Sequence, residues 1–144
     1  MNWREPLKIL SAGVALLNLL LLAGCSNSSA MNESTVNVKH VGQGEFADEV
    51  TRASGAVVVD FYATWCGPCR VLAPLMDKVA EPLAGKIKFF KVNIDESPGL
   101  AQNFQIEGVP TVLFFKDGQL VSRLTGLPTE AELQAKLDAL AAAK

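Results

Sequence analysis

The chain has 144 residues, of which 49% are hydrophobic and 19% are charged, so its length suits one globular domain with a leader. The formal net charge is −2, and no basic stripe lies among the sparse aromatic residues, which argues against a nucleic-acid partner. The three cysteines form one close pair, Cys66 and Cys69, and leave Cys25 as an odd thiol.

Residues 1–24 are predicted to be a targeting segment. Arg4 and Lys8 precede the apolar, Leu-rich residues 9–23, a run shorter than the roughly 20 residues that span a membrane. The run ends in Leu-Ala-Gly-Cys, which resembles the lipobox of bacterial lipoproteins. The resemblance implies that Cys25 is lipidated and anchors the chain to a membrane of the bacterial envelope, on its extracytoplasmic side.

Other interpretations of this segment stay open. It could be an ordinary signal peptide or an uncleaved anchor helix with an accidental cysteine, and a chain that starts at Met31 would be cytosolic. The residues after Cys25 are small and polar, so residues 25–35 are predicted to be a flexible tether to a domain at residues 36–144.

Strand and helix patterns alternate through this domain. Alternation at residues 36–41 predicts an edge strand, and a helix that ends at Gly55 is predicted from three apolar residues on one face: Phe46, Val50 and Ala53. The apolar run at residues 56–62 predicts a strand covered on both faces. A long helix is expected at residues 66–83, with Pro74 kinking it and five residues facing inward: Val71, Leu72, Leu75, Val79 and Leu83.

A third strand is predicted at residues 87–94, before a short helix that Ser97 caps and that ends at Phe104. Strands at 112–115 and 120–124 flank Asp-Gly, a strong hairpin signal. A capping-box pair then opens a last helix with three inward leucines: Thr129 with Glu132, then Leu133, Leu137 and Leu140. The order βαβαβαββα predicts a single α/β domain with a mixed central sheet flanked by helices.

The chemistry is predicted from Trp-Cys-Gly-Pro-Cys-Arg at residues 65–70. A thiol at a helix start faces unpaired backbone N–H groups and the positive helix end, which stabilise the thiolate that attacks disulfides. A second thiol one turn later can resolve the mixed disulfide. We therefore predict dithiol–disulfide exchange, with Cys66 as an exposed nucleophile and Cys69 as a buried resolving thiol.

Two other roles of the cysteine pair remain open, a zinc site and a structural disulfide. A closed zinc site takes four ligands, and beyond the pair the chain offers His40, which we expect to be a surface histidine, and Cys25. A purely structural disulfide would close a very short loop and stabilise the fold little.

Asp60 interrupts the buried apolar run. An unpaired carboxylate there is costly, so we expect its pKa to rise, and it could then accept the proton of Cys69 when that thiol attacks. Lys91 on the neighbouring strand is the expected charge partner. The competing interpretation is an aspartate that caps a turn at a strand end.

Five motifs in order resemble the thioredoxin family over about three quarters of the chain. They are VVVDFYATWCGPCR at 57–70, the proline in the next helix, FKVNID at 90–95, GVPT at 108–111 and FFKDGQ at 114–119. The resemblance implies the thioredoxin fold, a cis peptide bond before Pro110, and the proton-accepting role of Asp60. It also implies a substrate surface around Cys66 made of Trp65, Gly67, Pro68, Val109, Pro110, Gly126 and Leu127.

One residue departs from the family pattern: many thioredoxins carry Trp where this chain has Tyr62. Gly-Pro between the cysteines is the pairing typical of reducing thioredoxins. We therefore expect a membrane-anchored, monomeric oxidoreductase that reduces disulfides in protein substrates without a metal, nucleotide or flavin. Since disulfides persist outside the cytosol, it would need an electron donor, and a transmembrane thiol relay is the hypothesis.

Three alternative functions remain. They are an extracytoplasmic disulfide oxidase or isomerase, a cytosolic thioredoxin that starts at Met31, and a non-catalytic binding module tethered to the membrane.

Overall fold

The computed structural model describes residues 38–143 of the chain. Its elements follow the predicted order: β1 (Lys39–His40), α1 (Gln43–Phe46), the π-helical turn η1 (Ala47–Thr51), β2 (Ala56–Tyr62), α2 (Gly67–Ala80), the 3-10 turn η2 (Glu81–Leu83), β3 (Ile87–Asn93), α3 (Pro98–Asn103), β4 (Thr111–Lys116), β5 (Gln119–Thr125) and α4 (Glu130–Ala142). Within this range no helix is both long enough and apolar enough to span a bilayer.

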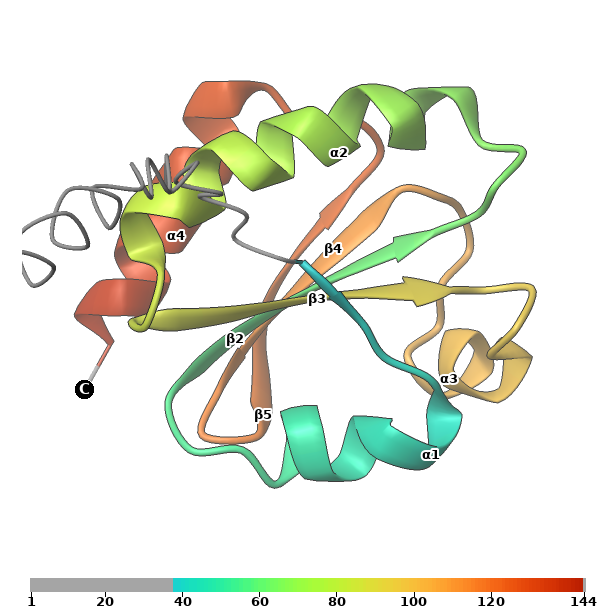
Figure 1. The fold of residues 1–144 in the computed structure, drawn as a ribbon, viewed down its shortest axis with the longest axis horizontal. Helices are drawn as coiled ribbons and strands as arrows, with labels where there is room; N and C mark the ends of the chain where they lie inside the picture. Colours follow the sequence, from blue (N-terminus) through green and yellow to red (C-terminus); the bar gives the residue numbers. More distant parts are fainter. Residues whose placement is uncertain (1–37, 144) are drawn as a thin grey trace, which may run out of the picture. The chain divides into compact units, whose positions relative to one another are not determined.

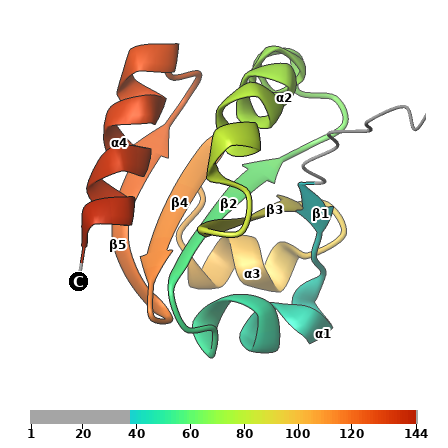
Figure 2. The ribbon, with the colours of Figure 1, turned by 60° about the vertical axis from the view of Figure 1, so that its left-hand side comes forward.

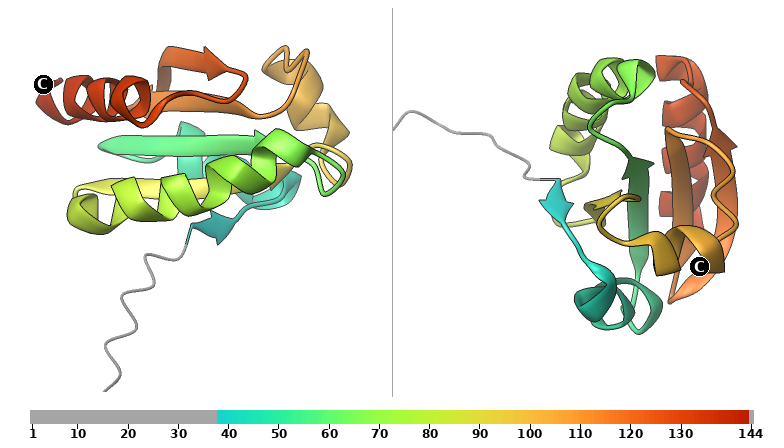
Figure 3. Two further views of the ribbon diagram at one scale, coloured as in Figure 1. Left: turned by 90° about the horizontal axis from the view of Figure 1, so that it is seen from above. Right: turned by 90° about the vertical axis from the view of Figure 1, so that its right-hand side faces the viewer.

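The five strands form one mixed sheet in the order β1-β3-β2-β4-β5. Strand β3 pairs in parallel with β1 and β2, whereas β4 pairs antiparallel with β2 and β5. Helices α2 and α4 cover one face of the sheet, and α1 and α3 lie against the other (Figure 1; Figure 2). Seen from above, α2 and α4 both run along the strands (Figure 3). The predicted mixed sheet flanked by helices is confirmed.

The sheet has a hydrophobic core on each face, because successive side chains of a strand point to opposite sides. Val58 of β2 packs under α2 and α4 with Leu72, Met76 and Leu137. Its neighbour Val57 packs on the other side. That second core contains four phenylalanine rings that form five contacting pairs with centroids 5.2 to 6.3 Å apart. They are here called the aromatic cluster: Phe46, Phe61, Phe104 and Phe115.

Several predicted boundaries and orientations need correction. In the described part of the chain the edge strand is two residues long, and the helix expected to end at Gly55 is one α-helical turn that continues as η1. Helix α2 ends at Ala80 rather than at residue 83. Val71 is 59% exposed, so its predicted inward orientation is wrong. The buried stripe of α2 instead includes Cys69, Leu72, Met76, Val79 and Ala80, a helical spacing that leaves residue 71 on the outer side.

The two predicted helix caps have different outcomes. Thr129 accepts a hydrogen bond from the backbone N–H of Glu132 (3.2 Å) and donates its own N–H to the Glu132 carboxylate (2.8 Å), so the capping box of α4 is confirmed. The three leucines expected to face inward from α4 are buried. Ser97 occupies the position before α3, but its side chain makes no capping hydrogen bond.

The β4–β5 hairpin turns at Asp117 and Gly118, whose φ angles are 48° and 77°. Both are left-handed, as in the tight turns that suit the twist of a hairpin. The turn is also packed against the loop before β2, because the Asp117 carboxylate accepts the N–H of Gly55 at 2.7 Å. A Cβ atom on Gly118 would lie 2.1 Å from the carbonyl oxygen of Thr51, so only glycine fits there.

Candidate active site

The two paired cysteines lie where α2 begins. Cys66 is the N-cap residue, and its Sγ accepts the backbone N–H of Cys69 at 3.1 Å. Gly67 and Pro68 form the first turn, and Pro68 has no N–H of its own to offer. The two sulfurs are joined in a Cys66–Cys69 disulfide. The Sγ atom of Cys66 therefore lies at the positive end of the α2 dipole, as predicted from the sequence.

The expected contrast between an exposed Cys66 and a buried Cys69 is wrong for this disulfide form. Cys66 is 3% exposed and Cys69 is 5% exposed. Each sulfur covers the other, and Ala63, Tyr62 and Val109 pack against the pair. The exposed groups beside the disulfide are instead its chain neighbours Trp65, Gly67 and Pro68.

Three chain segments meet around the disulfide. Trp65 is 65% exposed, and its indole N–H donates to the Asp95 carboxylate at 3.0 Å. The Val109–Pro110 peptide bond is cis, and the carbonyl oxygen of Pro110 accepts the N–H of Gly126 at 2.8 Å. Asp95 lies within the FKVNID motif but was not among the site residues predicted from the sequence. Its contact with Trp65 joins residues that are 30 positions apart and depends on the fold.

Asp60 is 6% exposed and lies within β2, which excludes a turn-capping role at a strand end. Its Oδ1 atom is buried without a hydrogen-bond partner. Burial raises the pKa of Asp60 to about 7, while the Lys91 ammonium acts in the opposite direction. Lys91 is in register with Asp60 on β3, but the two charged groups form no salt bridge.

Asp60 and Cys69 line the same cavity, which has a volume of about 170 Å³ and is here called the Asp60 cavity. Its other lining residues are Tyr62, Ala63, Thr64, Arg70, Ala73 and Lys91. A buried acid whose pKa is near neutrality and a cysteine therefore line one cavity that is partly open to solvent, through which a proton can pass directly or through water.

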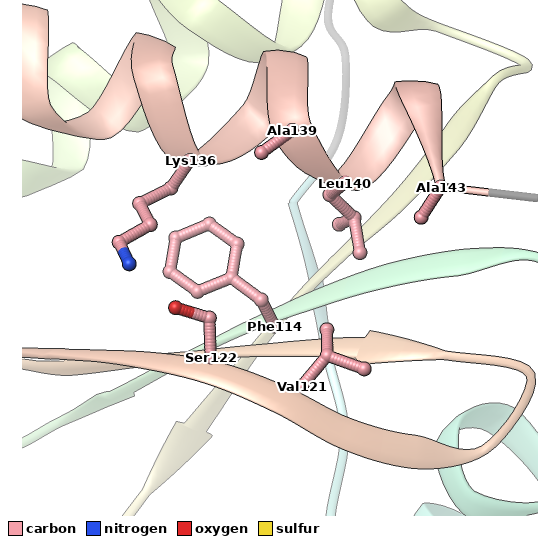
Figure 4. A pocket seen from close by; sticks show the side chains of 7 residues that line it. All are labelled: Phe114, Val121, Ser122, Lys136, Ala139, Leu140 and Ala143. Carbon is pink, nitrogen blue, oxygen red and sulfur yellow. The ribbon is translucent and has the colours of Figure 1, made fainter.

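Two further cavities lie away from the cysteines. One of about 270 Å³ lies between α4 and β5, where Phe114 is flanked by Lys136 from the helix and Val121 and Ser122 from the strand (Figure 4). Another of about 380 Å³ is lined by α3 and the residues that flank it, including Ile94, Gln105 and Ile106. Neither contains a sulfur, so the disulfide and the Asp60 cavity form the candidate active site.

Residues 37–139 match the family model described as Thioredoxin. The chain belongs to the thioredoxin family. A thioredoxin of Pseudomonas aeruginosa is 40% identical over 109 residues, which is 76% of this chain and 98% of that protein. The chloroplastic M-type thioredoxin of Pisum sativum is 42% identical over 106 residues (74% of this chain, 62% of that protein), and thioredoxin 1 of Synechococcus elongatus is 43% identical over 93 residues (65% and 87%).

The chain is therefore a thioredoxin-like protein-disulfide oxidoreductase whose CxxC motif holds the Cys66–Cys69 disulfide. The family match begins at residue 37. The lipobox-like sequence and Cys25 lie outside both that match and the described residues.

Proposed function

We propose that this thioredoxin-family protein reduces disulfides in protein substrates while lipidated Cys25 holds it at an extracytoplasmic membrane surface. The observation that carries the catalytic part is the cavity shared by Cys69 and the buried, unpartnered Asp60. The Gly-Pro pair between the cysteines supports the reducing direction. The apolar run that ends in Leu-Ala-Gly-Cys supports the anchor.

The reaction starts from the reduced form. The Cys66 thiolate, stabilised at the start of α2, attacks one sulfur of a substrate disulfide. The substrate S–S bond breaks, and its second sulfur leaves as a thiolate that takes a proton from water. A mixed disulfide between Cys66 and the substrate remains. The exposed Trp65 and the Val109–Pro110 segment lie beside this bond, where an extended peptide could add its backbone to the protein.

The second step releases the product. The Asp60 carboxylate accepts the Cys69 proton, and the Cys69 thiolate attacks the Sγ of Cys66. The mixed disulfide breaks, the second substrate thiolate leaves, and the Cys66–Cys69 disulfide forms, so two electrons have passed to the substrate. Because the pKa of Asp60 is raised to about 7, its carboxylate is a stronger base than that of an ordinary aspartate, while part of the protein still carries it in the ionised, proton-accepting form at neutral pH.

Reduction of insulin disulfides by the full-length protein tests the catalytic proposal. We expect Cys66→Ser to abolish turnover, because no thiolate attacks the substrate. Cys69→Ser should accumulate the mixed disulfide, and Cys25→Ser in detergent is the matched control that keeps turnover. If neither the parent nor Cys66→Ser showed thiol-dependent turnover, a non-catalytic binding module would replace the proposal.

The reduction potential of the Cys66–Cys69 couple tests the direction. We expect a value near the thioredoxin reference of about −270 mV. A potential near that of the oxidant DsbA, about −120 mV, would instead identify a disulfide oxidase.

The membrane anchor and the electron donor have separate tests. Metabolic labelling with palmitate should mark the parent but not Cys25→Ala, and Cys25→Ala should leave the membrane fraction. An unlabelled parent chain would favour translation from Met31 or an ordinary signal peptide. The transmembrane relay predicts that Cys66 and Cys69 stay oxidised in cells that lack it, and full reduction in such cells would exclude it.

A further inference from the structure

Three side chains from neighbouring strands form a row on the α2 side of the sheet. His40 of β1 is in register with Lys91 of β3, and Lys91 is in register with Asp60 of β2. Residues directly opposite one another on paired strands project from the same face. The sheet therefore places a lysine next to the buried acid and a histidine next to the lysine.

Tyr62 completes this group from the end of β2. It lies two residues after Asp60, on the same face, and lines the Asp60 cavity. The Lys91 Nζ atom lies over its ring, 6.0 Å from the centroid. This distance is at the outer limit of about 6 Å for a cation–π contact. The His40 ring meets the Tyr62 ring edge-on, with centroids 6.2 Å apart and an interplanar angle of 87°.

The loop after β3 brings a carboxylate near the histidine. The Glu96 carboxylate lies 3.6 Å from His40 Nε2, and it also accepts a hydrogen bond from the Asn93 side-chain amide at 2.9 Å. Asn93 is buried and in register with Tyr62. The ring of Tyr62 thus has an ammonium over its face and an imidazole at its edge, contributed by two other strands.

We propose that Tyr62 is a positioning residue: its ring face keeps the Lys91 ammonium beside the Asp60 cavity, which Lys91 helps to line. The inference rests on the proposed function, in which Asp60 accepts the proton of Cys69. A lysine on a long flexible stem gains entropy by turning into solvent, and the aromatic face opposes that motion. With the ammonium held close, the ionised form of Asp60 is favoured, and that form is the one able to accept a proton.

The titratable and charged groups around Asp60 come from β1, β2, α2, β3 and the loop after β3: His40, Tyr62, Cys69, Arg70, Lys91 and Glu96. On the β4 side, Asp60 is in register with apolar Val112. The pKa of the Tyr62 phenol is raised by burial and by Glu96 and Asp60, so the phenol stays neutral while Asp60 titrates. Replacing Tyr62 therefore changes no charge, and any effect on Asp60 must come through position or solvation.

The test is the titration of the Asp60 carboxyl carbon by NMR in the oxidised full-length protein, where neither Cys66 nor Cys69 titrates. Tyr62→Leu should move the midpoint upward by roughly half a pH unit, about a threefold change in the ionisation constant. Tyr62→Met is a second ring-less variant in case Leu does not fold. Tyr62→Phe and Tyr62→Trp keep an aromatic face and should titrate like the parent.

A double-mutant cycle with Lys91→Met separates positioning from packing. Lys91→Met alone should raise the midpoint, and Tyr62→Leu should add nothing further in that background, because the lysine through which it acts is gone. A shift that persists without Lys91 would overturn the proposal, since Tyr62 would then act by shielding Asp60 from water. An unchanged midpoint in both ring-less variants would overturn it as well.

A kinetic readout connects the positioning to the reaction. The rate at which Cys69 resolves the mixed disulfide should show its acid limb shifted upward in Tyr62→Leu by the same amount as the titration. Asp60→Asn should slow this step. If Asp60→Asn resolved the mixed disulfide at the parent rate, the proton-accepting role would fail, whereas the coupling between Tyr62 and Lys91 would still be decided by the titration.

Discussion

Asp60 and Phe61 are consecutive residues of β2, and both are buried, yet they serve opposite faces of the sheet. Phe61 joins the aromatic cluster, which packs within a hydrophobic core and whose rings meet at tilted or edge-on angles. Asp60 enters a cavity beside a cysteine, with one carboxylate oxygen left without a partner. These two consecutive side chains therefore lie on opposite faces of β2, Phe61 in a packed core and Asp60 in the candidate active site.

The two faces therefore make different contributions to the free energy of unfolding. Burial of aromatic side chains on the α1 and α3 side stabilises the fold. Burial of the carboxyl group on the α2 side opposes folding whenever that group is ionised. A stable core on one face allows the protein to keep an unfavourable group on the other.

The largest change in stability should come from Phe61→Ala. The substitution removes a ring that contacts Phe46 and Phe104 in the aromatic cluster. We expect it to lower the free energy of unfolding by about 3 to 5 kcal/mol, as for other large-to-small changes in a packed core. Urea unfolding measures the effect. A loss that depended strongly on pH would contradict the proposed division between the two faces.

Asp60→Asn should raise the free energy of unfolding at high pH, the opposite of the effect of Phe61→Ala. The pKa of Asp60 is raised from 3.8 to about 7, so the unfolded chain releases this proton first as the pH rises. The free energy of unfolding therefore falls between those two pH values, by on the order of 4 kcal/mol in total, and the cost persists above pH 7.

We expect Asp60→Asn to be more stable than the parent at pH 8 and close to it at pH 4, in urea unfolding at both values. Asp138→Asn on the exposed part of α4 is the matched control, since that carboxyl lies at the surface. If the gain at pH 8 were no larger than at pH 4, the buried carboxylate would not be the destabilising group.

The smallest expected change in stability is at the N-terminus of α4, the helix that covers the Asp60 side of the sheet. Thr129→Ala removes the two hydrogen bonds of the Thr129 hydroxyl at the start of α4: one accepted from the N–H of Glu132 and one donated to the Glu132 carboxylate. It should cost about 1 kcal/mol in the free energy of unfolding, the usual size of an N-cap loss. The Asp60 titration should be unchanged, because Thr129 does not line the Asp60 cavity. A shifted Asp60 midpoint would show that the helix and the site are coupled.

Local sequence signals predicted much of this fold. The bounds of β2 were predicted at both ends because a continuous apolar run begins after Gly55 and ends shortly before the Cys-Gly-Pro-Cys motif. The hairpin and the α4 capping box are also specified by residues two to three positions apart. The burial of Asp60 followed from its place inside the apolar run.

Contacts set by strand register could not be predicted in the same way. His40 was expected to be a surface residue, and it is exposed, but it also lies against Tyr62 and near Glu96. The burial of Cys66 depends on its bond to Cys69 and on Val109 from a distant loop. The outward orientation of Val71 follows from the rotation of α2 on the sheet, which the apolar pattern alone left undetermined.

The hairpin that joins β4 and β5 has a practical consequence for anyone labelling this protein. A two-residue surface turn is ordinarily the first choice for inserting an epitope or a fluorophore. Here the Asp117 carboxylate is bound to Gly55, and Gly118 sits against the Thr51 carbonyl, so an insertion would detach the turn from the loop that leads into β2. Between η2 and β3, Ala84 and Lys86 are exposed, whereas Gly85 has a left-handed φ of 78° and is best kept as glycine. A probe is better attached at Ala84 or Lys86.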